Sequence, residues 1–158
     1  MQVFVSYAHA DHKCCEKFLT HVGALKFDPG LVFWHDKSIL AGSRWTDEIA
    51  KNIEASSIFL LLFTPQFLKS TYILETEIPA IKEKRKTSGA LVIPVVIEQC
   101  QWEVANTLQA VPTDEKGIMP ILDWKPQRNG FNRAREQLAT AIKAHFGLPS
   151  KKLFEDTP

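Results

Sequence analysis

The sequence predicts a three-layer α/β domain, in which a five-stranded parallel sheet is covered by helices on both faces. Short apolar runs alternate with stretches of helical periodicity along the chain, and the runs themselves show little alternation of apolar and polar residues. Strands of this kind are buried on both faces, as in a parallel sheet between two helix layers. With 158 residues, the chain has the length of one ordinary domain.

Five apolar runs are the candidate strands: 3–6, 31–34, 58–63, 91–97 and 118–122. Pro94 and Pro120 lie inside the last two runs. Proline has no N–H to donate to a neighbouring strand, so we expect these two strands at or near one edge of the sheet, or bulged. The longest run, IFLLLF, is far shorter than the roughly 20 apolar residues that cross a membrane.

Four stretches carry apolar residues at helical spacing: 11–26, 43–55, 70–86 and 131–146. In the first stretch, Cys14, Phe18 and Val22 are expected to face the core. Gly147 follows the last stretch and is a typical residue for ending a helix. A further short helix is expected within 102–108.

Strands that alternate with helices indicate right-handed crossovers and a doubly wound, flavodoxin-like domain. Such sheets bind ligands beyond the carboxyl ends of their strands, near the point where the strand order reverses. The segments that follow the first three strands are 6–11, 34–42 and 64–70. We therefore expect the functional site there.

Composition excludes several function classes. Lys and Arg total 19 and Asp and Glu total 18, so a net charge of +1 creates no basic field for nucleic acid. No signal peptide or membrane span is recognisable. Three cysteines, two of them adjacent, predict neither a disulfide framework nor a metal site and fit the reducing cytoplasm. The glycine motifs GxGxxG and GxxxxGK[ST] are missing, so a dehydrogenase is not expected.

Four segments in order resemble a Toll/interleukin-1 receptor (TIR) domain of the bacterial type: VFVSYAHAD, VFWHDKSILAGSRW, IFLLLFTPQFLKSTYILETEIPAI and VIPVVI. The resemblance implies a flavodoxin-like domain over 1–148, with 149–158 as a tail or the start of a linker. Many family members hydrolyse NAD+ at the nicotinamide–ribose bond, and some form cyclic ADP-ribose. Other members are non-catalytic modules that recruit further TIR domains.

Of these two functions, we expect the enzyme, with NAD+ as the substrate and no cofactor. The resemblance implies activation by self-assembly into a homo-oligomer or filament, in a bacterial immune pathway. It also implies a sensor domain fused after the TIR domain in some members. The alternative is a non-catalytic interaction module.

The resemblance implies a catalytic glutamate in the helix after the third strand. Glu77 fits, because the bacterial pattern has an aromatic residue, here Tyr72, then four residues, then glutamate. Glu75 remains the alternative if the helix register differs. Independently of the family, cleavage of an N-glycosidic bond builds positive charge on the ribose, which a carboxylate stabilises. Pro79 removes the helix bond to the carbonyl of Glu75, and a kink there would tilt Glu77 toward the site.

The expected substrate-binding residues are Ser6, Tyr7, His9, Asp36, Lys37 and Tyr72. Ser6 and Tyr7 end the first strand, where a hydroxyl and an aromatic ring could hold a ribose, a phosphate or a base. The alternatives are a simple strand-end turn and, for His9, a solvated loop histidine.

The segment 34–42 resembles the family loop that closes over the nucleotide and contacts the next subunit. Gly42 gives the backbone freedom to turn into the following helix. Ile39 and Leu40 would leave apolar area exposed at the loop tip unless another subunit covers it, or unless they fold back onto their own domain. Trp34 and Trp45 are expected in the core.

Overall fold

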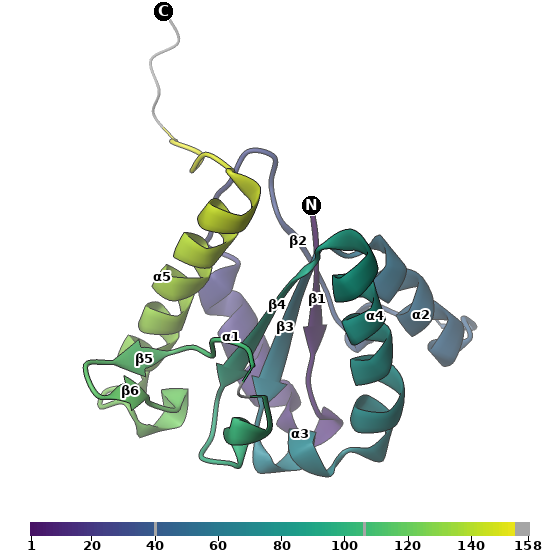
Figure 1. The fold of residues 1–158 in the computed structure, drawn as a ribbon, viewed down its shortest axis with the longest axis horizontal. Coiled ribbons are helices and arrows are strands. Elements are labelled where there is room, and N and C mark those ends of the chain that lie inside the picture. The colour runs from purple at the N-terminus through teal and green to yellow at the C-terminus, as the bar shows by residue number, and fades with distance from the viewer. Residues whose placement is uncertain (40, 106, 154–158) are drawn as a thin grey trace, which may run out of the picture.

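A parallel sheet lies between two helix layers in the computed structural model, which describes residues 1–39, 41–105 and 107–153 (Figure 1). The strand order is β2-β1-β3-β4, and each neighbouring pair is parallel. This arrangement confirms the predicted three-layer α/β class. The strands are β1 (Gln2–Ser6), β2 (Val32–Trp34), β3 (Ile58–Phe63) and β4 (Leu91–Val96).

The two helix layers form a separate hydrophobic cluster on each face of the sheet. The alternation of side chains along β3 supplies both, because successive residues point to opposite faces. Ile58, Leu60 and Leu62 pack with α1 and α5, whereas Phe59, Leu61 and Phe63 pack with α2, α3 and α4. The helices are α1 (His12–Val22), α2 (Trp45–Ala55), α3 (Pro65–Lys69), α4 (Ile78–Ser88) and α5 (Gln127–Phe146).

The fifth strand expected at 118–122 is not part of the sheet. Instead, β6 (Gly117–Ile118) pairs antiparallel with β5 (Thr113–Asp114), and Ile121–Asp123 forms a 3-10 turn. Pro120 cannot donate a ladder hydrogen bond, which explains why the strand ends before it.

The edge position beside β4 is taken over a short stretch by Val111. Its N–H donates to the carbonyl of Pro94 at 3.0 Å, and its carbonyl accepts from the N–H of Val96 at 2.8 Å. Pro94 therefore turns its backbone toward the outer edge of the sheet, where its missing N–H breaks no ladder to β3. The predicted edge position of this strand is confirmed.

Helix α1 buries Cys15, Phe18 and Val22. Cys14, which was expected to face the core, is half-buried and packs against the same hydrophobic cluster, whereas Cys15 is the more deeply buried of the two. Burial, with the negative charge of Asp36 as a smaller cause, raises the pKa of Cys15 to about 12, so its thiol stays protonated. Cys15 is thus a packing residue.

Helix α3 was not expected from the sequence, although its start carries clear signals. The hydroxyl of Thr64 caps the helix by accepting from the N–H of Phe67 at 3.0 Å, and Pro65 occupies the first turn. The same hydroxyl donates to Asp11 at 2.5 Å. This contact ties the segment after β3 to the segment after β1.

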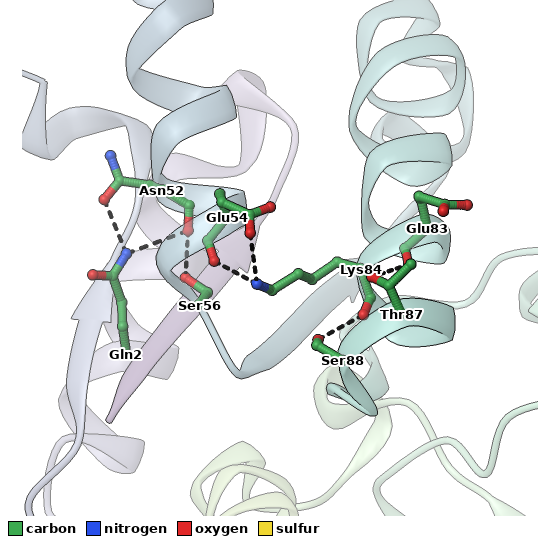
Figure 2. A network of polar contacts seen from close by, with 8 residues as sticks. All are labelled: Gln2, Asn52, Glu54, Ser56, Glu83, Lys84, Thr87 and Ser88. Atoms are coloured by element: carbon green, nitrogen blue, oxygen red, sulfur yellow. Dashed lines mark hydrogen bonds and ion pairs between the residues drawn. The ribbon is translucent and has the colours of Figure 1, made fainter.

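A polar network fastens α2 and α4 to each other, as Figure 2 shows. Lys84 donates to the backbone carbonyl of Glu54 at 2.6 Å and to its carboxylate at 3.2 Å. Nearby, Gln2 donates to the side chain of Asn52 at 2.9 Å. The network lies toward the carboxyl ends of both helices, so it leaves their N-terminal ends free to frame a site at the opposite end of the sheet.

After α5 the chain turns at Gly147, with a φ of 65°, and the N–H of Lys151 donates to the carbonyl of Lys26. The domain boundary at residue 148 stays a prediction. Within the described part of the chain, none of the helices combines the length and apolarity needed to cross a membrane.

Candidate active site

A cavity of 260 Å³ lies at the carboxyl ends of β1 and β2, beside the first residues of α2. Its lining draws on all three segments where a site was expected, after β1, β2 and β3. The carboxylates of Asp36 and Glu77 both line it, whereas no lysine or arginine among the described residues does. The location follows the general rule for doubly wound sheets.

Glu77 is buried in this cavity, with 6% of its surface exposed. The hydroxyl of Ser6 donates to its Oε2 at 3.4 Å. The pKa of Glu77 is raised to about 7, chiefly by burial and to a smaller extent by the negative charge of Asp36, while the hydrogen bond from Ser6 opposes the rise. Glu75, the alternative candidate, is exposed and does not line the cavity.

A π-turn over Ile73–Glu77 precedes α4. The N–H of Ile78 donates to the carbonyl of Ile73, five residues back, instead of four. The expected kink thus takes the form of a widened turn, which lies directly before Pro79. Turns of this kind are frequent at functional sites.

Asp36 connects the segments that follow β1 and β2. Its Oδ1 accepts a hydrogen bond from the Tyr7 hydroxyl at 2.6 Å, and its Oδ2 lies against Nε2 of His9. Burial and the Asp36 carboxylate raise the pKa of Tyr7, so Tyr7 remains a neutral donor. Lys37 does not join this group, because its amine binds the carboxylate of Glu16 at 2.6 Å.

Aromatic rings form much of the cavity wall. Trp45 lies against Tyr72 with ring centroids 4.4 Å apart, and the His9 ring meets Trp45 edge-on at 6.1 Å. Trp34 stacks on Phe4 at 5.0 Å. The sequence favoured the core for Trp34 and Trp45 over a role as stacking platforms; both are half-buried, pack against the core and also line the cavity. The position of Trp45, at the first turn of a helix that follows a predicted ligand loop, was the signal for this role.

A second cavity, of 410 Å³, adjoins the first and shares four of its residues. It is lined by Tyr7, His9, His12, Asp36, Lys37 and Trp45. Asp36 thus lines both cavities, Glu77 lines only the first, and Lys37 and His12 line only the second.

The loop expected to contact another subunit is only partly as predicted. Ile39 is half-buried and packs against the cluster that α2 and α4 share, so the alternative of folding back onto its own domain holds for this residue. Leu40 lies outside the described residues. Gly42 has a φ of 88°, a conformation that side chains other than glycine rarely adopt.

Metal ligation finds no support in the described ranges, where no group of three or more His, Cys, Asp or Glu side chains is placed to hold a metal ion. The cavity lining offers the carboxylates of Asp36 and Glu77, the ring of His9, hydroxyl groups and aromatic rings.

The family model described as "TIR domain" matches residues 3–139. Among curated proteins, the uncharacterized protein y4lF of Sinorhizobium fredii (strain NBRC 101917 / NGR234) is 32% identical over 147 residues, which cover 92% of this chain and 43% of that protein. The chain thus spans less than half the length of this relative.

Two solved structures share the fold. The TIR domains of the activated Roq1 resistosome, which directly recognises the pathogen effector XopQ, align with a TM-score of 0.55 and 18% identity, over 90% of this chain and 83% of that one. A metazoan TIR-STING receptor from C. gigas aligns with a TM-score of 0.53 and 17% identity, over 89% of this chain and 39% of that one.

Proposed function

The chain belongs to the TIR domain family, and we propose that it hydrolyses NAD+ at the nicotinamide–ribose bond. One observation carries the proposal: a buried carboxylate, Glu77, lines an aromatic-walled cavity at the carboxyl ends of the strands. The products are nicotinamide and either linear or cyclic ADP-ribose.

The proposed chemistry needs one carboxylate. As the bond between ribose C1′ and the ring nitrogen breaks, its electron pair returns to the ring, nicotinamide leaves neutral, and positive charge develops on the ribose. Ionised Glu77 stabilises that charge, which is worth about 10²–10³ in rate for one such contact. Water then attacks C1′ and loses a proton, or a nitrogen of the adenine attacks and closes the cyclic product. Ser6 orients the carboxylate through its hydroxyl.

The burial of Glu77 supports an enzyme over a scaffold. A carboxylate that loses its water without gaining a cation destabilises the fold, as its raised pKa indicates. Strained or costly groups of this kind concentrate at sites where chemistry requires them. A pure interaction module would gain stability from an uncharged side chain at this position.

We propose that assembly activates the enzyme. Only six residues line the second cavity, whereas fifteen line the first. A neighbouring copy could close this open side and complete the nucleotide site. We propose that this assembly takes place in the cytoplasm, as part of a bacterial defence pathway. A sensor domain elsewhere in the protein would drive it.

The second candidate is a non-catalytic module that recruits other TIR domains. The resistosome and receptor with the same fold favour this alternative, because both are named as recognition proteins. Incubation of concentrated protein with NAD+, followed by chromatography for nicotinamide and for linear and cyclic ADP-ribose, separates the two. If no nicotinamide forms, even when copies of the domain are tethered, the interaction module is the better account.

A further inference from the structure

The two joined cavities differ in the charged residues that line them. The first cavity is lined by the carboxylates of Asp36 and Glu77, and in the part of the chain that the structure describes no lysine or arginine lines it. The second cavity is lined by Lys37 and His12 in addition to the shared residues. A positively charged part of a ligand would therefore be favoured in the first cavity, beside Asp36 and Glu77.

The carboxylate of Asp36 is held in a fixed position in the lining of the first cavity. Its side chain is 15% exposed, and both carboxylate oxygens are engaged, one by the Tyr7 hydroxyl at 2.6 Å and the other by His9. These two contacts fix the carboxylate without burying it away from the cavity. The charge of Asp36 also contributes to the raised pKa of Glu77, so the two carboxylates share one electrostatic environment.

The walls beside these carboxylates are aromatic. Trp45 and Tyr72 lie 4.4 Å apart between ring centroids, and both line the first cavity. The negative face of an aromatic ring attracts a cation, and the attraction strengthens when water is excluded. The cavity thus favours a ligand group that is both flat and positively charged. An N-substituted pyridinium ring has both properties.

We infer that Asp36 is a specificity-determining residue that selects the positively charged pyridinium ring over its neutral counterpart. The site should then bind NAD+ and other N-substituted pyridinium ions, and discriminate against NADH. This inference rests on the proposed function for the identity of the ring as nicotinamide. It also explains product release, because nicotinamide leaves uncharged and is no longer attracted by Asp36.

The test measures binding and needs no turnover. Isothermal titration calorimetry gives the dissociation constants of 1-methylnicotinamide, a cation, and nicotinamide, its neutral counterpart. We expect the wild type to prefer the cation by about tenfold or more, as for one close charge pair that is partly shielded from water. Asp36→Asn should lose most of that preference.

The matched control is Asp47→Asn, which removes an exposed carboxylate near Trp45 that does not line either cavity. It should keep the wild-type preference. Equal affinities for the two ligands in the wild type would overturn the inference without any variant, and so would an unchanged preference in folded Asp36→Asn.

The outcomes also separate this inference from the proposed hydrolase. If the protein releases no nicotinamide from NAD+ but the cation preference depends on Asp36, the inference stands and the hydrolase proposal fails. If NAD+ is cleaved and the preference is missing, the hydrolase proposal stands and the role of Asp36 is wrong.

Discussion

Tyr72 and Glu77 line the same cavity although they lie five positions apart in one helical segment. In a regular α-helix, five residues turn the chain by about 500°, which leaves the two side chains about 140° apart. The π-turn over Ile73–Glu77 takes up the extra residue, with the N–H of Ile78 bonded to the carbonyl of Ile73. The aromatic residue and the carboxylate can therefore face one ligand only because the helix is locally widened.

Glu77 should make stability depend on pH in a defined direction. Its carboxyl has a pKa of about 7 in the folded chain and near 4.5 when unfolded, so the folded state keeps a proton that the unfolded state loses. The free energy of unfolding of the wild type should fall as the pH rises through this window. The pH-dependent part of this destabilisation is measured against Glu77→Gln, which has no carboxyl at this position. The wild type should lose about 3 kcal/mol of unfolding free energy by pH 8, and this loss should vanish near pH 4.5.

Denaturant unfolding of wild type and Glu77→Gln from pH 4.5 to 8 checks this dependence. Exposed Glu75→Gln is the control and should show a difference from wild type that does not change with pH. A constant difference for Glu77→Gln as well would mean that Glu77 titrates normally in the folded chain.

The rate of NAD+ cleavage should require the ionised form of Glu77. We expect kcat/KM to rise about tenfold per pH unit below pH 7 and to level off above it, because that profile reports the free enzyme. The profile of kcat should level off at lower pH, since a bound cation favours the carboxylate. Initial rates between pH 5 and pH 9 give both profiles, and a flat kcat/KM would rule out Glu77 as the group that must ionise.

Ser6→Ala should shift the acid limb of the kcat/KM profile to higher pH. The hydroxyl of Ser6 lowers the pKa of Glu77, so its removal leaves more of the carboxyl protonated at pH 7. The rate should then fall at pH 7 and recover at pH 9. Ser88→Ala, at the exposed end of α4, is the control. If the plateau at pH 9 falls and the limb stays in place, Ser6 acts on the substrate and not through Glu77.

Specific activity should increase with protein concentration. Because Ile39 packs on its own domain, a charged substitution there would disturb the fold as well as any contact between copies. Tethering is the cleaner manipulation, since a short flexible linker raises the local concentration to the millimolar range. We expect tandem copies to exceed the free domain in activity per active site at equal micromolar concentration. Equal activities would mean that one copy contains the complete site.

The sequence predicted the parallel sheet and both helix layers, because apolar runs and helical periodicity are local properties. Two features were not predicted, although the residues that explain them are visible in the sequence. The strand expected at 118–122 stops before Pro120, and a short helix begins after the capping residue Thr64. The π-turn was not predictable from periodicity, because a widened turn breaks the spacing by which helices are recognised. The grouping of Tyr7, His9 and Asp36 joins segments far apart in the chain, and only the structure places them in contact.

Site prediction depended on the pattern more than on the chemistry of single residues. The spacing from Tyr72 favoured Glu77 over Glu75, and the structure places only Glu77 in the cavity. The role of Trp45 in the cavity lining was not predicted, because an aromatic residue at helical spacing fits the core equally well. The catalytic role of Glu77 stays a prediction.

The most direct measurement is the rate of nicotinamide release from NAD+ by wild type, Glu77→Gln and Glu75→Gln at equal concentration and pH 8, with folding confirmed by circular dichroism. The account predicts that Glu77→Gln loses about 10²–10³ in rate while exposed Glu75→Gln stays near wild type. Near-normal turnover in Glu77→Gln, or loss of activity only in Glu75→Gln, would contradict it.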